Sequence, residues 1–138
     1  MRVGWGENAM YPDGERVAVI AAQNEFGNPA LKIPPRPFMR PAQSENMSMW
    51  KTKMAEGIKA SFNNTKTVGE VFEAIGLLVA GGIRTAITKV TSPALKTATV
   101  KARLRGTKQG KAVSLTAAKP LVDTGYMLNS LTSEVVEK

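Results

Sequence analysis

A proline-rich segment constrains the fold of this chain more than any other stretch of its sequence. Residues 33–41 read Ile-Pro-Pro-Arg-Pro-Phe-Met-Arg-Pro, with proline at four of the nine positions. Each proline fixes its own φ, removes a backbone donor and pushes the preceding residue toward extended geometry. No helix or central strand can therefore run through residues 33–37, and the segment is predicted to be an extended elbow between a strand and a helix.

The elbow carries both apolar and cationic side chains. We expect Phe38 and Met39 to be its inward anchors, with Arg36 and Arg40 flanking them. Two interpretations of the segment stay open. It is either a proline-rich connection whose apolar residues fill the core, or a solvent-facing polyproline motif that docks a partner.

Three segments have strand-like patterns. Residues 16–23 are rich in β-branched and apolar side chains, which favours a strand covered on both faces. Residues 2–6 alternate apolar and other side chains and predict a short strand, joined to the first through a turn at residues 12–14. Residues 131–136 predict a final strand that pairs with the N-terminal strands.

Two longer segments have helical periodicity. Apolar residues recur at steps of three or four over residues 47–62, which predicts an amphipathic helix over residues 41–63. Thr67 and Glu70 have the spacing of a capping box and predict the start of a second helix, over residues 67–90. Glycines at positions 81 and 82 of that helix cost about 1 kcal/mol each relative to alanine. We therefore expect a kink there, or the close approach of another backbone from the same or a neighbouring subunit.

The net charge of +8 comes from one block of the sequence. Between Ala74 and Val122 there is no Asp or Glu, whereas nine Lys or Arg residues occur. We expect residues 91–118 to be a flexible basic loop or hairpin arm, with a short strand around Val100, Ala102 and Leu104. Its candidate contact residues are Lys96, Lys101, Arg103, Arg105, Lys108 and Lys111. Clustered cations bind phosphates without reading sequence, although a solvated face is the alternative.

The composition disfavours catalysis. The chain has no Cys and no His, which removes disulfides, thiolate metal sites and the usual general base near neutral pH. No cofactor is expected. No apolar run reaches the roughly 18 residues of a membrane span, and no signal peptide is recognised, so the chain is expected to be cytoplasmic when made.

The triplet Asp123, Thr124 and Gly125 has two interpretations. It is typical of a turn or of a helix start. It also matches the active-site triplet of aspartic proteases, which need two copies. One copy in a short helical chain disfavours that reading, although a homodimer would supply a second.

Taken together, these patterns predict one α+β domain over residues 1–138. The expected architecture is a small mixed or antiparallel sheet of about three to five short strands, packed against two long helices, with a long basic loop or hairpin arm.

Two motifs resemble those of tailed-bacteriophage minor structural proteins, the tail-completion or neck proteins that include minor tail protein Z-like proteins. The first motif is Asn-Glu-Phe-Gly at residues 24–27 with the proline-rich run at residues 33–40. The second is Lys-Pro-Leu-Val-Asp-Thr-Gly-Tyr-Met-Leu-Asn-Ser-Leu at residues 119–131. The resemblance covers residues 16–136, but this chain lacks the longer N-terminal helix that the family often carries.

The resemblance implies a non-catalytic virion protein, made in the host cytoplasm, that forms a homo-oligomeric ring such as a hexamer. Other neck or tail proteins are its implied partners. Neighbour contacts would fall to Pro34, Arg36, Phe38, Arg40, Asp123, Thr124 and Gly125. The basic arm would reach an adjacent ring, an acidic partner or packaged DNA. The alternative function is a basic nucleic-acid-binding domain without sequence specificity.

Overall fold

The computed structural model describes residues 1–91, 93–101, 121 and 125–136. Its elements in chain order are β1 (Arg2–Gly4), α1 (Val17–Phe26), α2 (Met39–Phe62), α3 (Val68–Lys89), α5 (Tyr126–Asn129) and β2 (Thr132–Glu134). Residues 97–101 are also helical. The predicted mixture of α and β structure is confirmed, but helices dominate and the sheet is smaller than expected, with two strands in the described residues.

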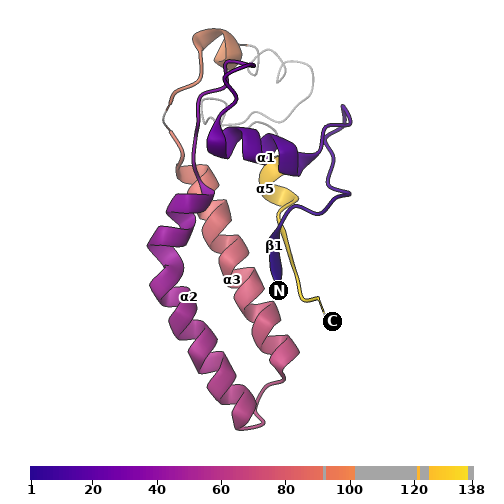
Figure 1. Ribbon diagram of the computed structural model, residues 1–138, viewed down its shortest axis with the longest axis vertical. Coiled ribbons are helices and arrows are strands. Elements are labelled where there is room, and N and C mark those ends of the chain that lie inside the picture. The colour runs from indigo at the N-terminus through magenta and orange to yellow at the C-terminus, as the bar shows by residue number, and fades with distance from the viewer. Residues whose placement is uncertain (92, 102–120, 122–124, 137–138) are drawn as a thin grey trace.

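Helices α2 and α3 form an antiparallel hairpin along the long axis of the molecule (Figure 1). They are 24 and 22 residues long. The capping box that begins α3 is present as predicted. The Glu70 amide donates to Thr67 Oγ1 at 3.2 Å, and the Thr67 amide donates to Glu70 Oε2 at 2.7 Å. These bonds satisfy amide donors that a helix start leaves free, so they fix the residue at which α3 begins.

The glycine pair in α3 makes room for a side chain. A Cβ on Gly82 would lie 2.9 Å from Cζ2 of Trp50 in α2, whereas a Cβ on Gly81 would meet nothing within 4 Å. The expected close approach therefore occurs at Gly82, within one chain, and its partner is an indole ring rather than a backbone.

By length and composition, α3 is apolar enough to cross a membrane, although the sequence has no unbroken apolar run of that length. It is the one such helix among the residues that the structure describes. Seven of its residues are buried within the fold. The buried residues include Ile75, Ile83 and Ile87, whereas Val68 and Leu77 of the same helix are exposed.

The two ends of the described chain pair as predicted. β1 and β2 are antiparallel, with Val3 opposite Ser133. The strands pack on α3, where a Cβ on Gly76 would lie 2.8 Å from the Ser133 Cβ. In Figure 1 β1 lies beside α3, and the turn of the α2–α3 hairpin extends beyond it.

Residues 16–23 do not form the predicted strand, because Val17–Phe26 is helix α1. Alanines are frequent here and favour helix. Val17, Ala21 and Glu25 recur every four residues and are buried on one face. Strand propensity depends on a neighbouring strand and on burial, and no strand pairs with this segment in the described residues. The elbow consequently joins two helices.

The core lies where α1, the elbow, α3 and α5 meet. Its largest fully buried side chains are Phe38, Ile87, Leu131 and Val17. The Trp5 ring meets Phe38 edge-on, with centroids 6.0 Å apart, and Trp5 Nε1 donates to the Met127 carbonyl at 2.7 Å. The N-terminal segment is thereby attached to both the elbow and α5.

Candidate functional site

A buried carboxylate connects α1 to the start of α2. Glu25 Oε2 accepts hydrogen bonds from the amides of Phe38 (2.7 Å) and Met39 (2.9 Å). Its Oε1 lies 2.8 Å from Nε of Arg40. A helix start has free amides and a partial positive charge, so an anion there is stabilising. Glu25 therefore caps helix α2, which begins at Met39, fourteen residues further along the chain. We call Glu25, Arg40 and the Phe38 and Met39 amides the α1–α2 lock.

Two opposing effects set the pKa of Glu25. Burial of the carboxyl raises the pKa, but the hydrogen bonds from the Phe38, Met39 and Arg40 amides and from the Arg40 side chain outweigh it. The pKa is therefore below its ordinary value. The carboxylate stays charged at neutral pH and can act as a permanent cap rather than as a proton donor.

Gly27 lets the chain turn from α1 into the elbow. Its φ is +78°, a left-handed conformation that favours glycine. A Cβ there would lie 2.9 Å from the backbone nitrogen of Pro35. The turn is closed by two bonds between Asn28 and Ile33, at 2.8 and 2.9 Å. The backbone geometry of this turn therefore explains the glycine of the first motif.

The predicted contact residues of the elbow divide into two groups. Phe38 is buried, and Arg36 is also buried, with its Nε donating to the Pro93 carbonyl at 2.8 Å. Pro34 is half-buried, and the Arg40 side chain is 63% exposed despite its ion pair. Phe38 fills the core, as the first of the two interpretations expects. Within this group, Pro34 and Arg40 have area left for a neighbour.

The structure describes part of the second motif, namely residues 121 and 125–131. Gly125 has a φ of +76° and precedes α5, in agreement with a helix start. The residues that follow are held by Arg84, which the sequence identified only as one of the nine cations of the acid-free block. Arg84 donates to the carbonyls of Leu128 (3.2 Å) and Leu131 (2.6 Å). Asp123 and Thr124 lie outside the described residues.

The structure also describes part of the basic segment, namely residues 91 and 93–101. Lys96 and Lys101 are exposed. Residues 97–101 are helical, so the strand expected around Val100 is wrong at that residue. The other four candidate cations lie outside the described residues, as do the neighbouring positions of the expected strand. The four cations outside the described residues are Arg103, Arg105, Lys108 and Lys111.

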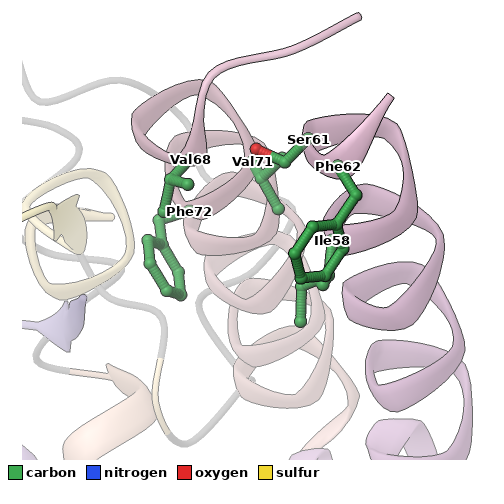
Figure 2. A pocket seen from close by; sticks show the side chains of 6 residues that line it. All are labelled: Ile58, Ser61, Phe62, Val68, Val71 and Phe72. Carbon is green, nitrogen blue, oxygen red and sulfur yellow. The ribbon is translucent and has the colours of Figure 1, made fainter. Parts of the chain in front are cut away.

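An open apolar groove lies at the turn of the α2–α3 hairpin. Figure 2 shows the side chains that line it: Ile58, Ser61, Phe62, Val68, Val71 and Phe72. Its volume is about 190 Å³. Phe62 is 83% exposed, and Ile58 and Val68 are also exposed. We call this the tip groove. Two members of the apolar stripe predicted on α2 therefore lie in the groove rather than in the core.

A second apolar surface lies on α1 and the turn that follows it. Val19, Ala22 and Phe26 share the face of α1 that points away from the core, and all three are exposed. Leu31 in the following turn is exposed as well. We call these four residues the α1 face. A helix that is apolar on all sides is typically covered on all sides. The uniform apolar run at the start of α1 was the signal for this surface.

Within the described residues, no group of three or more Asp or Glu side chains could hold a metal ion. Glu25, the one buried carboxylate in the part of the chain that the structure describes, is fully engaged by the α1–α2 lock. The described surface carries the tip groove, the α1 face and exposed cations. No described protein family, curated protein or solved structure matches this chain.

Proposed function

We propose that this chain is a bacteriophage virion structural protein of the tail-completion or neck type, which assembles with copies of itself into a ring. Its two motifs support this proposal through their resemblance to that family. The structure gives the first motif a physical role, because Glu25, Gly27 and Arg40 hold α2 at a set angle to α1. In this proposal the protein acts through its surfaces and has no turnover chemistry.

The positions of the two apolar surfaces are the observation that carries the proposal. The tip groove and the α1 face lie at opposite ends of α2 (Figure 1). A helix of 24 residues is about 36 Å long at 1.5 Å per residue. The two surfaces cannot cover each other within one copy. A contact between different surfaces of successive copies repeats head to tail, and it gives a ring when the rotation closes.

The exposed cations would serve a second contact. Lys96 and Lys101 begin the acid-free basic segment. In a ring, this segment would face an adjacent ring, an acidic neck or tail protein, or packaged DNA. The same proposal places the protein in the virion, and in the host cytoplasm during assembly.

Light scattering on the purified protein at low and high salt tests this function, with electron microscopy of any large species. We expect closed rings, because apolar contacts persist when salt screens surface charges. The mass would give the number of copies. A monomer at every salt and protein concentration would contradict self-assembly.

The acid-free basic block favours a second candidate, a nucleic-acid-binding domain without sequence specificity. That function predicts binding to duplex DNA of any sequence. Its log affinity would fall against log salt with a slope of roughly −0.9 for each phosphate neutralised. A ring protein that only surrounds DNA need not bind duplex measurably when isolated. Salt-dependent binding by a protein that stays monomeric would favour this second function.

A further inference from the structure

We propose that one end of the molecule binds the phosphate backbone of duplex DNA through Lys32, Lys96 and Lys101. This end consists of residues 27–37, which contain the elbow, and residues 93–101, and we call it the elbow end. The inference rests on the proposed function, which leaves open whether the exposed cations face a protein or packaged DNA. It commits them to DNA.

The buried side chain of Arg36 joins the two segments of the elbow end. Its Nε donates to the Pro93 carbonyl at 2.8 Å, and its Nη2 lies 3.5 Å from the Ala94 carbonyl oxygen. In Figure 1 the turn that follows α1 and the short helix at residues 97–101 lie at the same end of the molecule, opposite the turn of the α2–α3 hairpin. Lysines that are far apart in the sequence therefore share one end of the structure.

Both segments of the elbow end come from acid-free parts of the sequence. No Asp or Glu occurs in residues 26–44 or in the basic block described above. The two acids that border residues 26–44 are already paired. Glu25 pairs with Arg40 at 2.8 Å, and Glu45 pairs with Lys89 at 3.7 Å. No acid of its own segments therefore offsets the positive charge of the elbow end.

The three lysines of the elbow end have charge available for a partner. Lys32, Lys96 and Lys101 are exposed, and none forms an ion pair within the described part of the chain. The exposed acids Asp13 and Glu15 precede α1, whereas Lys32 follows it. The 10 residues of α1 span about 15 Å, which exceeds the Debye length of about 8 Å at physiological ionic strength. Salt therefore screens these acids from Lys32.

The chemistry of this surface favours the backbone of a duplex. Duplex DNA carries one negative charge per about 1.7 Å of its axis, so lysines from separate segments can each meet a phosphate and release counterions. A folded acidic protein offers carboxylates at a few fixed positions instead. Single strands bind through successive aromatic rings. Phe26 is the one exposed aromatic residue within residues 26–44 and 93–101, and the Arg40 guanidinium lies over its ring.

Two matched triple variants of the full-length protein test the surface. The first combines the substitutions Lys32→Gln, Lys96→Gln and Lys101→Gln. The control combines three substitutions of exposed lysines on α2 and in the hairpin turn, namely Lys51→Gln, Lys59→Gln and Lys66→Gln. Both variants lose the same net charge. Fluorescence anisotropy of a labelled duplex of mixed sequence measures binding at several salt concentrations, and circular dichroism checks that the fold is retained.

We expect the first triple variant to bind the duplex more weakly than the wild type at every sequence. Its slope of log affinity against log salt should become shallower by roughly 0.9 for each lysine that contacts a phosphate. The control variant should bind as the wild type does. Equal losses in the two variants would assign the binding to net charge and overturn the inference. Equally tight binding of the wild type to poly-glutamate would also overturn it.

Light scattering on the same samples separates this inference from the proposed function. Both variants should assemble as the wild type does, because none of the substituted lysines lines the tip groove or belongs to the α1 face. A wild-type protein that assembles but binds no duplex would overturn the inference and leave the proposed function standing. A wild-type protein that stays monomeric would contradict the ring, whereas a loss of binding confined to the first variant would still support the elbow end as the phosphate-binding surface.

Discussion

Nε of Arg40 lies 2.8 Å from Oε1 of Glu25, and the other carboxylate oxygen of Glu25 accepts the first amides of α2. The carboxylate therefore joins two helices through charge-assisted bonds, which are stronger than neutral hydrogen bonds. The guanidinium reaches past it to the carbonyl oxygen of Glu25 at 3.3 Å and lies over Phe26. This pair sets the direction of the α2–α3 hairpin and thus the separation of the tip groove from the α1 face.

Glu25→Gln is expected to destabilise the fold. The substitution keeps the shape of the side chain but removes the charge that the α2 amides and Arg40 bind. Hydrogen bonds to charged groups contribute about 1.5–3 kcal/mol each, and Gln retains part of that bonding, so we expect a loss of about 2 kcal/mol in the free energy of unfolding. Urea denaturation measures it. Glu15→Gln is the control, since Glu15 is exposed and should change stability little.

The pH dependence of stability follows from the lowered pKa of Glu25. A carboxyl whose pKa is lower in the folded state stabilises the fold fully above its ordinary value of 4.5, and this contribution is lost as the pH falls through the folded-state pKa. The free energy of unfolding should therefore drop in acid. Glu25→Gln should flatten part of that drop. The remainder includes Glu70, whose pKa is lowered by its bonds to Thr67. Equal acid dependence in the two proteins would contradict this role.

Gly27→Ala should be more damaging than Gly14→Ala. Both glycines have positive φ, +78° and +88°, so alanine at either position is strained, at a cost of roughly 1–3 kcal/mol. A Cβ at Gly14 meets nothing within 4 Å, whereas one at Gly27 meets the Pro35 backbone. The difference between the two variants in thermal or urea unfolding isolates the close approach of the turn to the elbow. Equal losses would show that the elbow yields easily.

The glycine pair of α3 predicts effects of opposite sign. Gly81→Ala should stabilise the protein by about 1 kcal/mol, because alanine favours helix and the position is open. Gly82→Ala should destabilise it, since its Cβ would lie 2.9 Å from the Trp50 ring and overpacking typically costs about 1–3 kcal/mol. Both are read from urea unfolding curves. A gain from Gly82→Ala would mean that the indole can move aside.

Local patterns in the sequence determined several elements of this protein. The prolines of residues 33–37 exclude regular structure and produce an extended elbow, because their effect on the backbone is local. The start of α3 follows from Thr67 and Glu70, three residues apart, whose bonds are made within one helical turn. The pairing of the N- and C-terminal strands was also predictable from their alternation.

Tertiary structure alone decided the rest. Residues 17–23 are helical although their propensity favours a strand, because Val17, Ala21 and Glu25 are buried on one face of α1. Glu25 accepts hydrogen bonds from the amides of Phe38 and Met39, thirteen and fourteen residues further along the chain, and no local spacing encodes these contacts. Phe62 belongs to an apolar stripe like that of a core helix, yet it is exposed, because the turn of the α2–α3 hairpin extends beyond the strands that pack on α3 (Figure 1). Periodicity identifies which side chains share a face, but only the packing of other elements determines whether that face is covered.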